Sequence, residues 1–270
     1  MVKILILGST GMLGNAVSKL FIEKGYDVTC TYRNKTFENY NQNSIEFDAL
    51  TCNDFSFLKK FDYVINCIGI IKPFMNINMA DSIYINSVFP RKLAGYCFTQ
   101  GIKLIHITTD CVFSGKGGNY DEDSLHDCVD EYGKSKSLGE PKEGCMVLRT
   151  SVIGDEIHKN ASLIAWAKSM KNKEVNGFTN HLWNGITTKH YAEICEQIIQ
   201  NNLYTKGLFH IYSNSINKFD LLNLLNEHYN LNLTIKQFID KDIIDRTLST
   251  KKDLIGKLNI KNIKQQIKEL

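Results

Sequence analysis

The chain has 270 residues, enough for one large α/β domain or for a cofactor domain with a small substrate lobe. Apolar residues make up 43% and charged residues 23% of it, a composition typical of globular proteins that argues against disorder. Its net charge of +3 is too small to favour a nucleic acid or a membrane surface as partner, so we expect a small-molecule partner.

Short apolar runs alternate with longer amphipathic runs in the first half of the chain, which predicts strand–helix units building a parallel sheet. Runs that are apolar on nearly every residue suit strands covered by helices on both faces, as in a doubly wound α/β fold. The predicted strands are Lys3–Leu7, Asp27–Tyr32, Ser44–Phe47, Tyr63–Cys67, Lys103–Ile107 and Cys145–Leu148. The predicted helices are Leu13–Lys24, Asn53–Lys59, Met79–Gln100 and Glu131–Gly139.

The alternation weakens beyond Gly154, which divides the chain into two unequal parts. We predict a Rossmann-type domain at residues 1–154. Residues 155–270 are assigned mainly to a small C-terminal substrate-binding lobe and C-terminal helices, with some segments returning to the first domain. The tail from Leu248 to Leu270 is predicted to be helical, charged and solvated.

A glycine loop with the spacing G-x-x-G-x-x-G follows the first predicted strand and precedes a helix. Glycines at such positions permit a tight turn, a close backbone approach to a pyrophosphate, and close contact between helix and sheet. The helix start offers free amides to the phosphates. A glycine turn without a ligand is the alternative. The loop residues predicted to bind a dinucleotide are Gly8, Thr10, Gly11, Met12, Leu13 and Gly14.

Two residues after later strands bear on the choice of dinucleotide. The second predicted strand is followed by Arg33, where a site specific for NAD usually has an acidic residue. An arginine suits the 2′-phosphate of NADP(H) instead, although a plain surface arginine is the alternative. Asp48, at the end of the third strand, is predicted to accept a hydrogen bond from the adenine amine, unless it is an ordinary turn residue.

Tyr132 and Lys136 stand four residues apart on one predicted helix and therefore on one face of it. A neighbouring ammonium makes a phenol useful as a proton donor near neutral pH. The fifth strand leads into Thr108 and Thr109, of which only one faces the site because side chains alternate along a strand. We favour Thr109 as the hydroxyl that aligns a substrate carbonyl. The predicted catalytic residues are Thr109, Tyr132 and Lys136.

Five segments together carry a family resemblance: Gly8–Gly14, Asn66–Gly69, Thr108–Phe113, Tyr132–Lys136 and Leu148–Thr150. The set resembles the extended short-chain dehydrogenases, and within them the dTDP-4-dehydrorhamnose reductase group. The segment Arg246–Lys251 is similar to the C-terminal segment of that group. The resemblance implies a Rossmann fold with a small lobe, NADP(H) as cofactor, and reduction of a nucleoside-diphospho-4-keto-6-deoxy sugar.

The same resemblance implies roles for residues outside the catalytic set. Cys67 and Gly69 would line the cofactor site, and Asn86 would support the catalytic residues, a helix cap or surface asparagine being the alternative. The region Asn180–Thr187 matches the substrate loop of the group loosely, and no proline precedes Tyr132 closely. The residues implied to contact substrate are Asn86, Cys111, Phe113, His181, Trp183 and Arg246.

Three other functions stay open. The group resembles the non-catalytic partner of methionine adenosyltransferase, which would make the chain a regulatory NADP-binding subunit. A dehydratase or epimerase on the same scaffold is a second alternative. Asp110, beside Thr109, does not separate it from a reductase, because that residue also belongs to the reductase-like motif. A bifunctional 3,5-epimerase/4-reductase is the third, with Cys111 and either His158 or His181 as proton carriers.

The eight cysteines are scattered, without a Cys-x-x-Cys pair or a Cys/His cluster at zinc-ligand spacing. We expect reduced thiols and no metal site. Without a signal-peptide pattern or an apolar run near the ~20 residues that span a bilayer, we expect a cytoplasmic protein with no membrane partner. A homodimer is left open.

Overall fold

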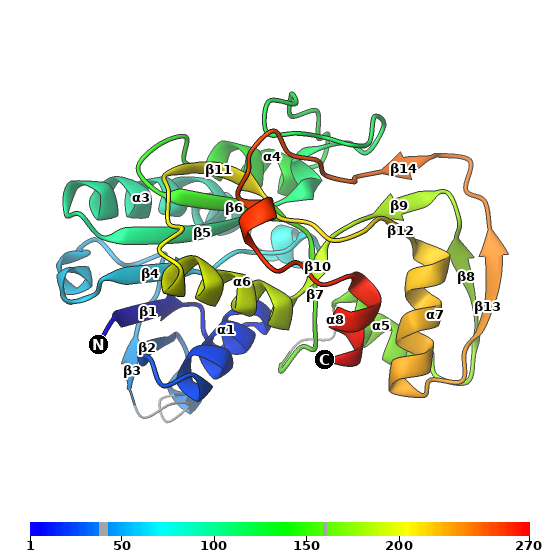
Figure 1. Cartoon of the computed structure of the whole chain (residues 1–270), viewed down its shortest axis with the longest axis horizontal. Coiled ribbons are helices and arrows are strands. Elements are labelled where there is room, and N and C mark those ends of the chain that lie inside the picture. Colours follow the sequence, from blue (N-terminus) through cyan, green and yellow to red (C-terminus); the bar gives the residue numbers. More distant parts are fainter. Residues whose placement is uncertain (38–42, 159–160) are drawn as a thin grey trace.

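The structure is a computed structural model that describes residues 1–37, 43–158 and 161–270. Its centre is a seven-stranded sheet in the order β11-β6-β5-β4-β1-β2-β3, in which every neighbouring pair is parallel (Figure 1). This order, with helices on both faces, confirms the predicted Rossmann-type fold. The strands are β1 (Lys3–Leu7), β2 (Asp27–Tyr32), β3 (Ser44–Glu46), β4 (Tyr63–Asn66), β5 (Lys103–Thr109), β6 (Met146–Thr150) and β11 (Gly207–His210).

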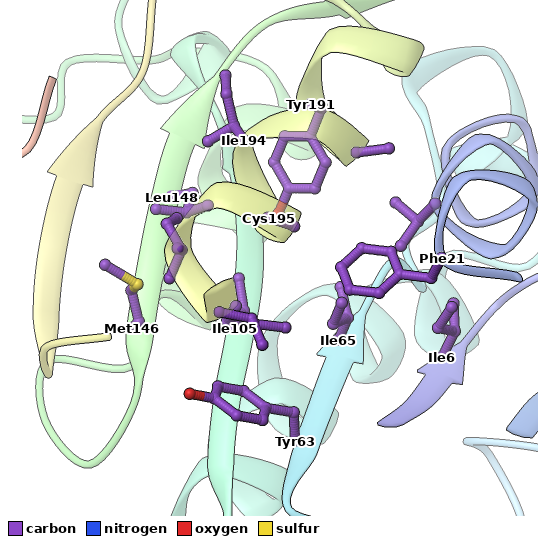
Figure 2. Close-up of a cluster of buried hydrophobic side chains, with 14 of the residues drawn as sticks. Ile6, Phe21, Tyr63, Ile65, Ile105, Met146, Leu148, Tyr191, Ile194 and Cys195 are labelled. Atoms are coloured by element: carbon purple, nitrogen blue, oxygen red, sulfur yellow. The ribbon is translucent and has the colours of Figure 1, made fainter. Parts of the chain in front are cut away.

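One face of the sheet is covered by α1 (Met12–Glu23) and α6 (Thr188–Gln200). Figure 2 shows Tyr191, Ile194 and Cys195 of α6 lying over strand side chains such as Ile105 and Leu148, all of them buried. The other face is covered by α3 (Phe89–Thr99) and the short helix η2 (Ser56–Lys60). Burial of apolar side chains on both faces accounts for the strands being apolar throughout.

The long predicted helix Met79–Gln100 is helical throughout, but its middle is not α-helical. It consists of α2 (Met79–Ile83), a π-helical turn η4 (Tyr84–Val88) and α3. The following helix on this side, α4 (Glu131–Gly139), packs against η4. Such π turns are often found at functional sites. Shorter 3₁₀ turns are η1 (Lys35–Phe37), η3 (Lys72–Ile77), η5 (Asp110–Val112) and η6 (Ile255–Lys257).

The C-terminal lobe is built around α7 and two small sheets beside the main sheet (Figure 1). Strand β8 pairs with β13, and β9 lies between β12 and β14. Residues 188–210, with α6 and β11, return to the main sheet. The lobe elements are α5 (Leu163–Ser169), β8 (Glu174–Phe178), β9 (His181–Trp183), β12 (Ile216–Asn217), α7 (Lys218–Tyr229), β13 (Thr234–Phe238), β14 (Ile244–Asp245) and α8 (Ile263–Lys268), with β7 (Val152–Ile153) pairing β10 (Ile186–Thr187).

The tail corrects the prediction of a long solvated helix. Only η6 and α8 are helical, and Leu248, Leu254 and Ile267 are buried. The helix α8 starts late because Asn262 caps it, its side chain accepting a hydrogen bond from the Gln265 amide. Apolar residues of the tail therefore complete the packing of both domains.

The segment 244–250, here called the C-terminal strap, runs beside the loop that follows β5. The Tyr120 amide donates to the Thr247 carbonyl at 2.9 Å, and the Ser249 amide donates to the Tyr120 carbonyl at 2.7 Å. The Asn119 amide also donates to the Thr247 hydroxyl at 2.9 Å. The strap thus joins the lobe to the loop that follows β5. Within the described residues, no helix is long and apolar enough to cross a bilayer.

Candidate active site

The glycine loop lies at the carboxyl end of β1, where parallel sheets bind ligands. Gly8 has a φ of +79°, a conformation that side chains other than glycine rarely adopt. A Cβ on Gly14 would collide with the Gly8 carbonyl oxygen, so both glycines are needed for the turn and the close start of α1. Gly11 instead is exposed at the helix N-terminus, and leaves the first amides of α1 open to a phosphate.

Ser9 and Thr31 hold this loop against β2, and the sequence analysis missed both. The Ser9 hydroxyl donates to the Thr31 carbonyl at 2.6 Å and accepts from the Thr31 amide at 2.9 Å. The Gly8 amide donates to the Thr31 hydroxyl at 2.9 Å. A hydroxyl residue facing the loop from the second strand is the only signal that the sequence offers for this contact.

The other loop residues differ in accessibility. Thr10 and Met12 are partly exposed near the start of α1, whereas the Leu13 side chain is buried in the core and can contribute only its backbone. Arg33 is exposed directly after β2 and makes no hydrogen bond or ion pair with the described part of the chain. Asp48 is half-buried and accepts from the Leu50 amide at 3.0 Å, as a turn residue does.

Helix α4 is capped by Asp130, whose side chain accepts from the Gly133 amide at 2.8 Å. Lys136 is buried, its Nζ 3.5 Å from the Ile107 carbonyl oxygen, and burial lowers its pKa to about 8. Burial also raises the pKa of Tyr132. The Thr109 side chain opposes part of this rise. The two helix residues and the end of β5 therefore form one site.

The structure separates the two threonines of β5. The Thr109 hydroxyl donates to Asp110 Oδ1 at 3.1 Å and accepts from the Cys111 amide at 3.1 Å, in addition to its interaction with Tyr132. The Thr108 hydroxyl is buried and has no partner among the described residues. The geometry supports Thr109 as the residue beside the proton donor.

Asn86 is buried in η4 and connects the cofactor side of the site with α4, so it neither caps a helix nor faces solvent. Its amide nitrogen donates to the Ile70 carbonyl at 2.9 Å and to the Ser135 hydroxyl at 3.1 Å, and its oxygen accepts from the Ile70 amide at 2.9 Å. A Cβ on Gly69 would lie 3.7 Å from Lys136 Nζ and 3.6 Å from Asn86 Oδ1. Gly69 therefore keeps the space beside these polar groups free.

Two cysteines lie near this edge of the sheet. Cys67 follows β4, is half-buried, and its amide donates to the Leu7 carbonyl at 3.0 Å. Burial, together with the neighbouring Asp110 carboxylate, raises the pKa of the Cys111 thiol to about 12. Cys111 is thus a neutral thiol beside Tyr132.

Phe113 does not line the site as implied for a substrate contact. Its ring is completely buried and stacks on Tyr120 with 4.1 Å between centroids, while the Arg149 guanidinium lies 5.1 Å from the same ring. Phe113 packs the loop after β5 onto the sheet. Phe113 follows the 3₁₀ turn η5, and a sequence pattern does not fix the side-chain direction after such a turn.

The remaining predicted substrate residues come from the lobe. His181 stacks on Phe178 and has Nε2 3.3 Å from Asp240 Oδ2, so its contacts are inside the lobe. Trp183 is buried in β9. Arg246 reaches the loop after β5, since its Nε donates to the Phe113 carbonyl at 3.0 Å.

Lys218, the first residue of α7, also belongs to this neighbourhood and was not predicted. Its Nζ lies 5.0 Å from the centroid of the Trp183 ring, and its charge interacts with Asp110 and Cys111. A lone lysine far along the chain from the catalytic motif carries no sequence signal of such a position. Among the described residues, no group of three or more His, Cys, Asp or Glu side chains is arranged to hold a metal ion.

A parallel sheet with a glycine loop, a buried lysine and a tyrosine at its carboxyl edge defines an extended short-chain dehydrogenase fold. The chain belongs to the family of the RmlD substrate binding domain, which matches residues 2–236. This confirms the family resemblance read from the motifs.

Relatives with different names match this chain. Methionine adenosyltransferase 2 subunit beta of Xenopus tropicalis is 29% identical over 246 residues, covering 84% of this chain and 72% of the relative. The dTDP-4-dehydrorhamnose reductase of Aggregatibacter actinomycetemcomitans is 26% identical over 234 residues, covering 78% and 73%. The crystal structure of dTDP-4-dehydrorhamnose reductase from Bacillus anthracis in complex with NADP has a TM-score of 0.75 at 18% identity, covering 100% of this chain and 98% of that one. The last likeness establishes the fold alone.

Proposed function

We propose that the protein is an NADPH-dependent reductase of the 4-keto group of a nucleoside-diphosphate 4-keto-6-deoxy sugar. The observation that carries the proposal is the proximity of the Tyr132 and Thr109 side chains, with the buried Lys136 one turn along the same helix. A protein that only binds a dinucleotide has no need of a proton donor at this place. The name of the reductase relative supports the substrate class.

The residues around the glycine loop fit NADP(H). The open amides at the start of α1 suit the pyrophosphate, and Arg33 suits the 2′-phosphate. Gly69 leaves room beside Lys136 and Asn86 where the nicotinamide ribose would lie. When bound there, NADPH supplies a hydride to the carbonyl carbon of the substrate.

The side chains of the chain itself supply the proton and the alignment. Because burial raises the pKa of Tyr132, its phenol stays protonated and can donate to the carbonyl oxygen. Lys136 provides a neighbouring positive charge for the phenolate that forms. Thr109 aligns the carbonyl, and Asn86 holds α4 at its distance from the loop after β4.

Replacing Tyr132 tests the mechanism. Tyr132→Phe removes only the transferred proton, so we expect reduction to fall by about 10²- to 10⁴-fold while NADPH binding stays near normal. The measurement is NADPH oxidation with a panel of dTDP-, UDP- and GDP-linked 4-keto sugars, alongside NADPH titration. Tyr229→Phe, which removes a hydroxyl bonded to Asp155 in the lobe, is the matched control and should keep full activity. An active Tyr132→Phe enzyme would refute the mechanism.

A second candidate is a non-catalytic NADP-binding subunit, favoured by the matches to methionine adenosyltransferase 2 subunit beta. The same panel separates the two functions, because such a subunit would bind NADPH and oxidise it with none of the sugars. The epimerising reductase has less support. A thiol with a pKa of about 12 provides little thiolate to remove a proton from carbon.

A further inference from the structure

Asn66 and His106 form a buried side-chain pair that the proposed mechanism does not use. Asn66 ends β4, His106 lies opposite it on β5, and both residues are buried. The side-chain amide nitrogen of Asn66 lies 3.0 Å from His106 Nδ1. Asn66 Oδ1 accepts a hydrogen bond from the Ile68 amide at 3.1 Å. The pair therefore links β5 to the loop that follows β4.

The contacts of Asn66 define the protonation state of His106. Because Asn66 Oδ1 is bonded to a backbone amide, the imidazole faces the side-chain amide nitrogen, which can only donate. His106 Nδ1 is therefore the acceptor, and the ring is neutral with its hydrogen on Nε2. Burial and the charge of Lys136 on α4 hold the pKa of His106 well below its usual range.

The loop that follows β4 lies between two parts of the cofactor site. A Cβ on Gly8 would meet Ile68 Cγ1 at 2.9 Å and the Ile68 amide nitrogen at 3.2 Å, so Ile68 packs directly against the glycine loop. At the next residue, a Cβ on Gly69 would lie 3.7 Å from Lys136 Nζ. A shift of Ile68 would therefore change the contact with the glycine loop and also the space beside Lys136.

Two asparagines anchor this loop. Asn86 holds both the amide and the carbonyl of Ile70. Asn66 holds the Ile68 amide, while its other end donates to His106. Without an acceptor on His106, a buried amide group would be left unsatisfied, which favours rotation of the Asn66 side chain towards another partner. The imidazole therefore stabilises the orientation in which Asn66 holds Ile68.

We propose that His106 is a positioning residue for the cofactor, which acts through Asn66 to fix residues 68–70 between the glycine loop and Lys136. The inference rests on the cofactor site of the proposed reductase and adds a residue that acts on this site through another side chain. A loop that is fixed before NADPH binds removes the entropy cost of ordering it on binding. The neutral ring also avoids a second positive charge near Lys136.

Two replacements of His106 test this role by NADPH binding alone. His106→Leu removes the acceptor for Asn66, so we expect NADPH to bind about tenfold more weakly. His106→Asn places an acceptor oxygen near the position of Nδ1, so it should bind NADPH nearly as well as the wild type. The measurement is a fluorescence titration with NADPH at a temperature at which each variant is folded. A His106→Asn protein that binds as weakly as His106→Leu would contradict the role of the acceptor.

A fragment of the cofactor separates a local effect from a general loss of structure. Adenosine 2′,5′-bisphosphate has the adenine half of NADPH without the nicotinamide ribose, so His106→Leu should leave its dissociation constant nearly unchanged. Equal weakening of both ligands would assign His106 a purely structural role. The matched control is His228→Leu, which replaces a histidine that lies against Tyr229 in the lobe and should leave both affinities unchanged.

The wild-type protein provides a test that does not depend on the folding of a variant. Nitrogen-15 NMR of the histidine rings shows which ring nitrogen carries the hydrogen, and the spectrum of His106→Asn identifies the signals of His106. We expect the Nε2–H form to persist from about pH 8 to about pH 5.5, because Nδ1 accepts from Asn66 and Lys136 is the charged group that acts on the ring. A hydrogen on Nδ1, or titration near the ordinary pKa of about 6.5, would overturn the proposal.

Failure of this inference and failure of the reductase are distinguishable. Unchanged NADPH affinity in His106→Leu overturns the positioning role, whatever the activity of the wild type. Weakened NADPH binding in His106→Leu, together with no turnover of any keto sugar by the wild type, supports the positioning role and refutes the reductase.

Discussion

Arg33 is the single residue on which the choice between NADPH and NADH depends. It is exposed at the carboxyl end of β2, and its guanidinium is not engaged by the described residues. An unengaged guanidinium next to the glycine loop can make a charge-assisted, two-pronged contact with a phosphate. NADH has no phosphate at that position and gains nothing from the contact.

We therefore predict that Arg33→Ala raises the KM for NADPH by about tenfold or more and leaves the KM for NADH nearly unchanged. Arg33→Lys keeps the charge but loses the fork of donors, so its KM for NADPH should lie between those of the wild type and Arg33→Ala. Initial rates with both cofactors provide the measurement. Equal changes for NADPH and NADH would contradict the assignment.

The contact between α4 and η4 holds in place the helix that carries Tyr132 and Lys136. Gly139 lies where α4 crosses η4, and a Cβ there would overlap the Asn86 carbonyl oxygen. The Ser87 hydroxyl donates to the Ser135 carbonyl at 2.7 Å across the same contact. The two helices can approach this closely only because position 139 has no side chain.

Gly139→Ala should force α4 away from η4, with a loss of about 1–3 kcal/mol of stability and a fall in kcat because Tyr132 and Lys136 move with the helix. Gly95→Ala is the matched control: position 95 of α3 has open space for a Cβ, and alanine favours a helix by up to about 1 kcal/mol. Urea unfolding and steady-state rates measure both effects. A stable and fully active Gly139→Ala protein would disprove the role of this contact.

The sequence predicts six of the seven strands of the main sheet, most of which contain apolar runs, and misses β11. The start of every one of the first five strands agrees with the structure. The lobe strands were not predicted, since β9, β12 and β14 are two or three residues long and carry no alternation. In the site, the Tyr132–Lys136 spacing was visible as a local pattern. Lys218 and the hydrogen bonds of Asn86 depend on packing between distant segments, which no local pattern records.

A polar network around the buried Arg149 connects the sheet, the loop after β5 and the end of α4. Arg149 of β6 donates from Nε and Nη2 to the carboxylate of Glu140, at 2.9 and 2.6 Å. Its Nη1 lies 2.8 Å from His210 Nε2, and Nη2 lies 2.7 Å from His126 Nε2. Because a guanidinium is always a donor, these histidine nitrogens are acceptors, so both rings are neutral. Burial lowers the pKa of both His126 and His210.

This network predicts a loss of stability in mild acid. Both histidines have folded pKa values below the unfolded value of about 6.5, so the unfolded chain binds more protons once the pH falls below that value. The stability that they contribute is complete above about pH 6.5 and is lost as the pH falls toward their folded pKa values. Each histidine that stays neutral adds a slope of up to about 1.4 kcal/mol per pH unit in that window.

Urea unfolding at pH 7.5 and at pH 5.5 measures the effect, a window that lies above the titration of ordinary carboxylates. His126→Gln keeps an acceptor for Arg149 and cannot be protonated, so its stability should fall less between the two pH values. Equal stability of the wild type at both pH values would contradict the neutral state of these histidines.

The position of the C-terminal strap in the chain also affects the order in which contacts form during synthesis. The loop that it braces, with Tyr120, leaves the ribosome long before Thr247 and Ser249 do. Nascent domains fold from their amino-terminal side as the chain emerges. The glycine loop and the first strands can therefore assemble cotranslationally, whereas the contacts of Tyr120 with Thr247 and Ser249 can form only after those two residues have been translated. The nascent polypeptide therefore passes through a stage in which the glycine loop has formed and the loop after β5 is not yet braced by the strap.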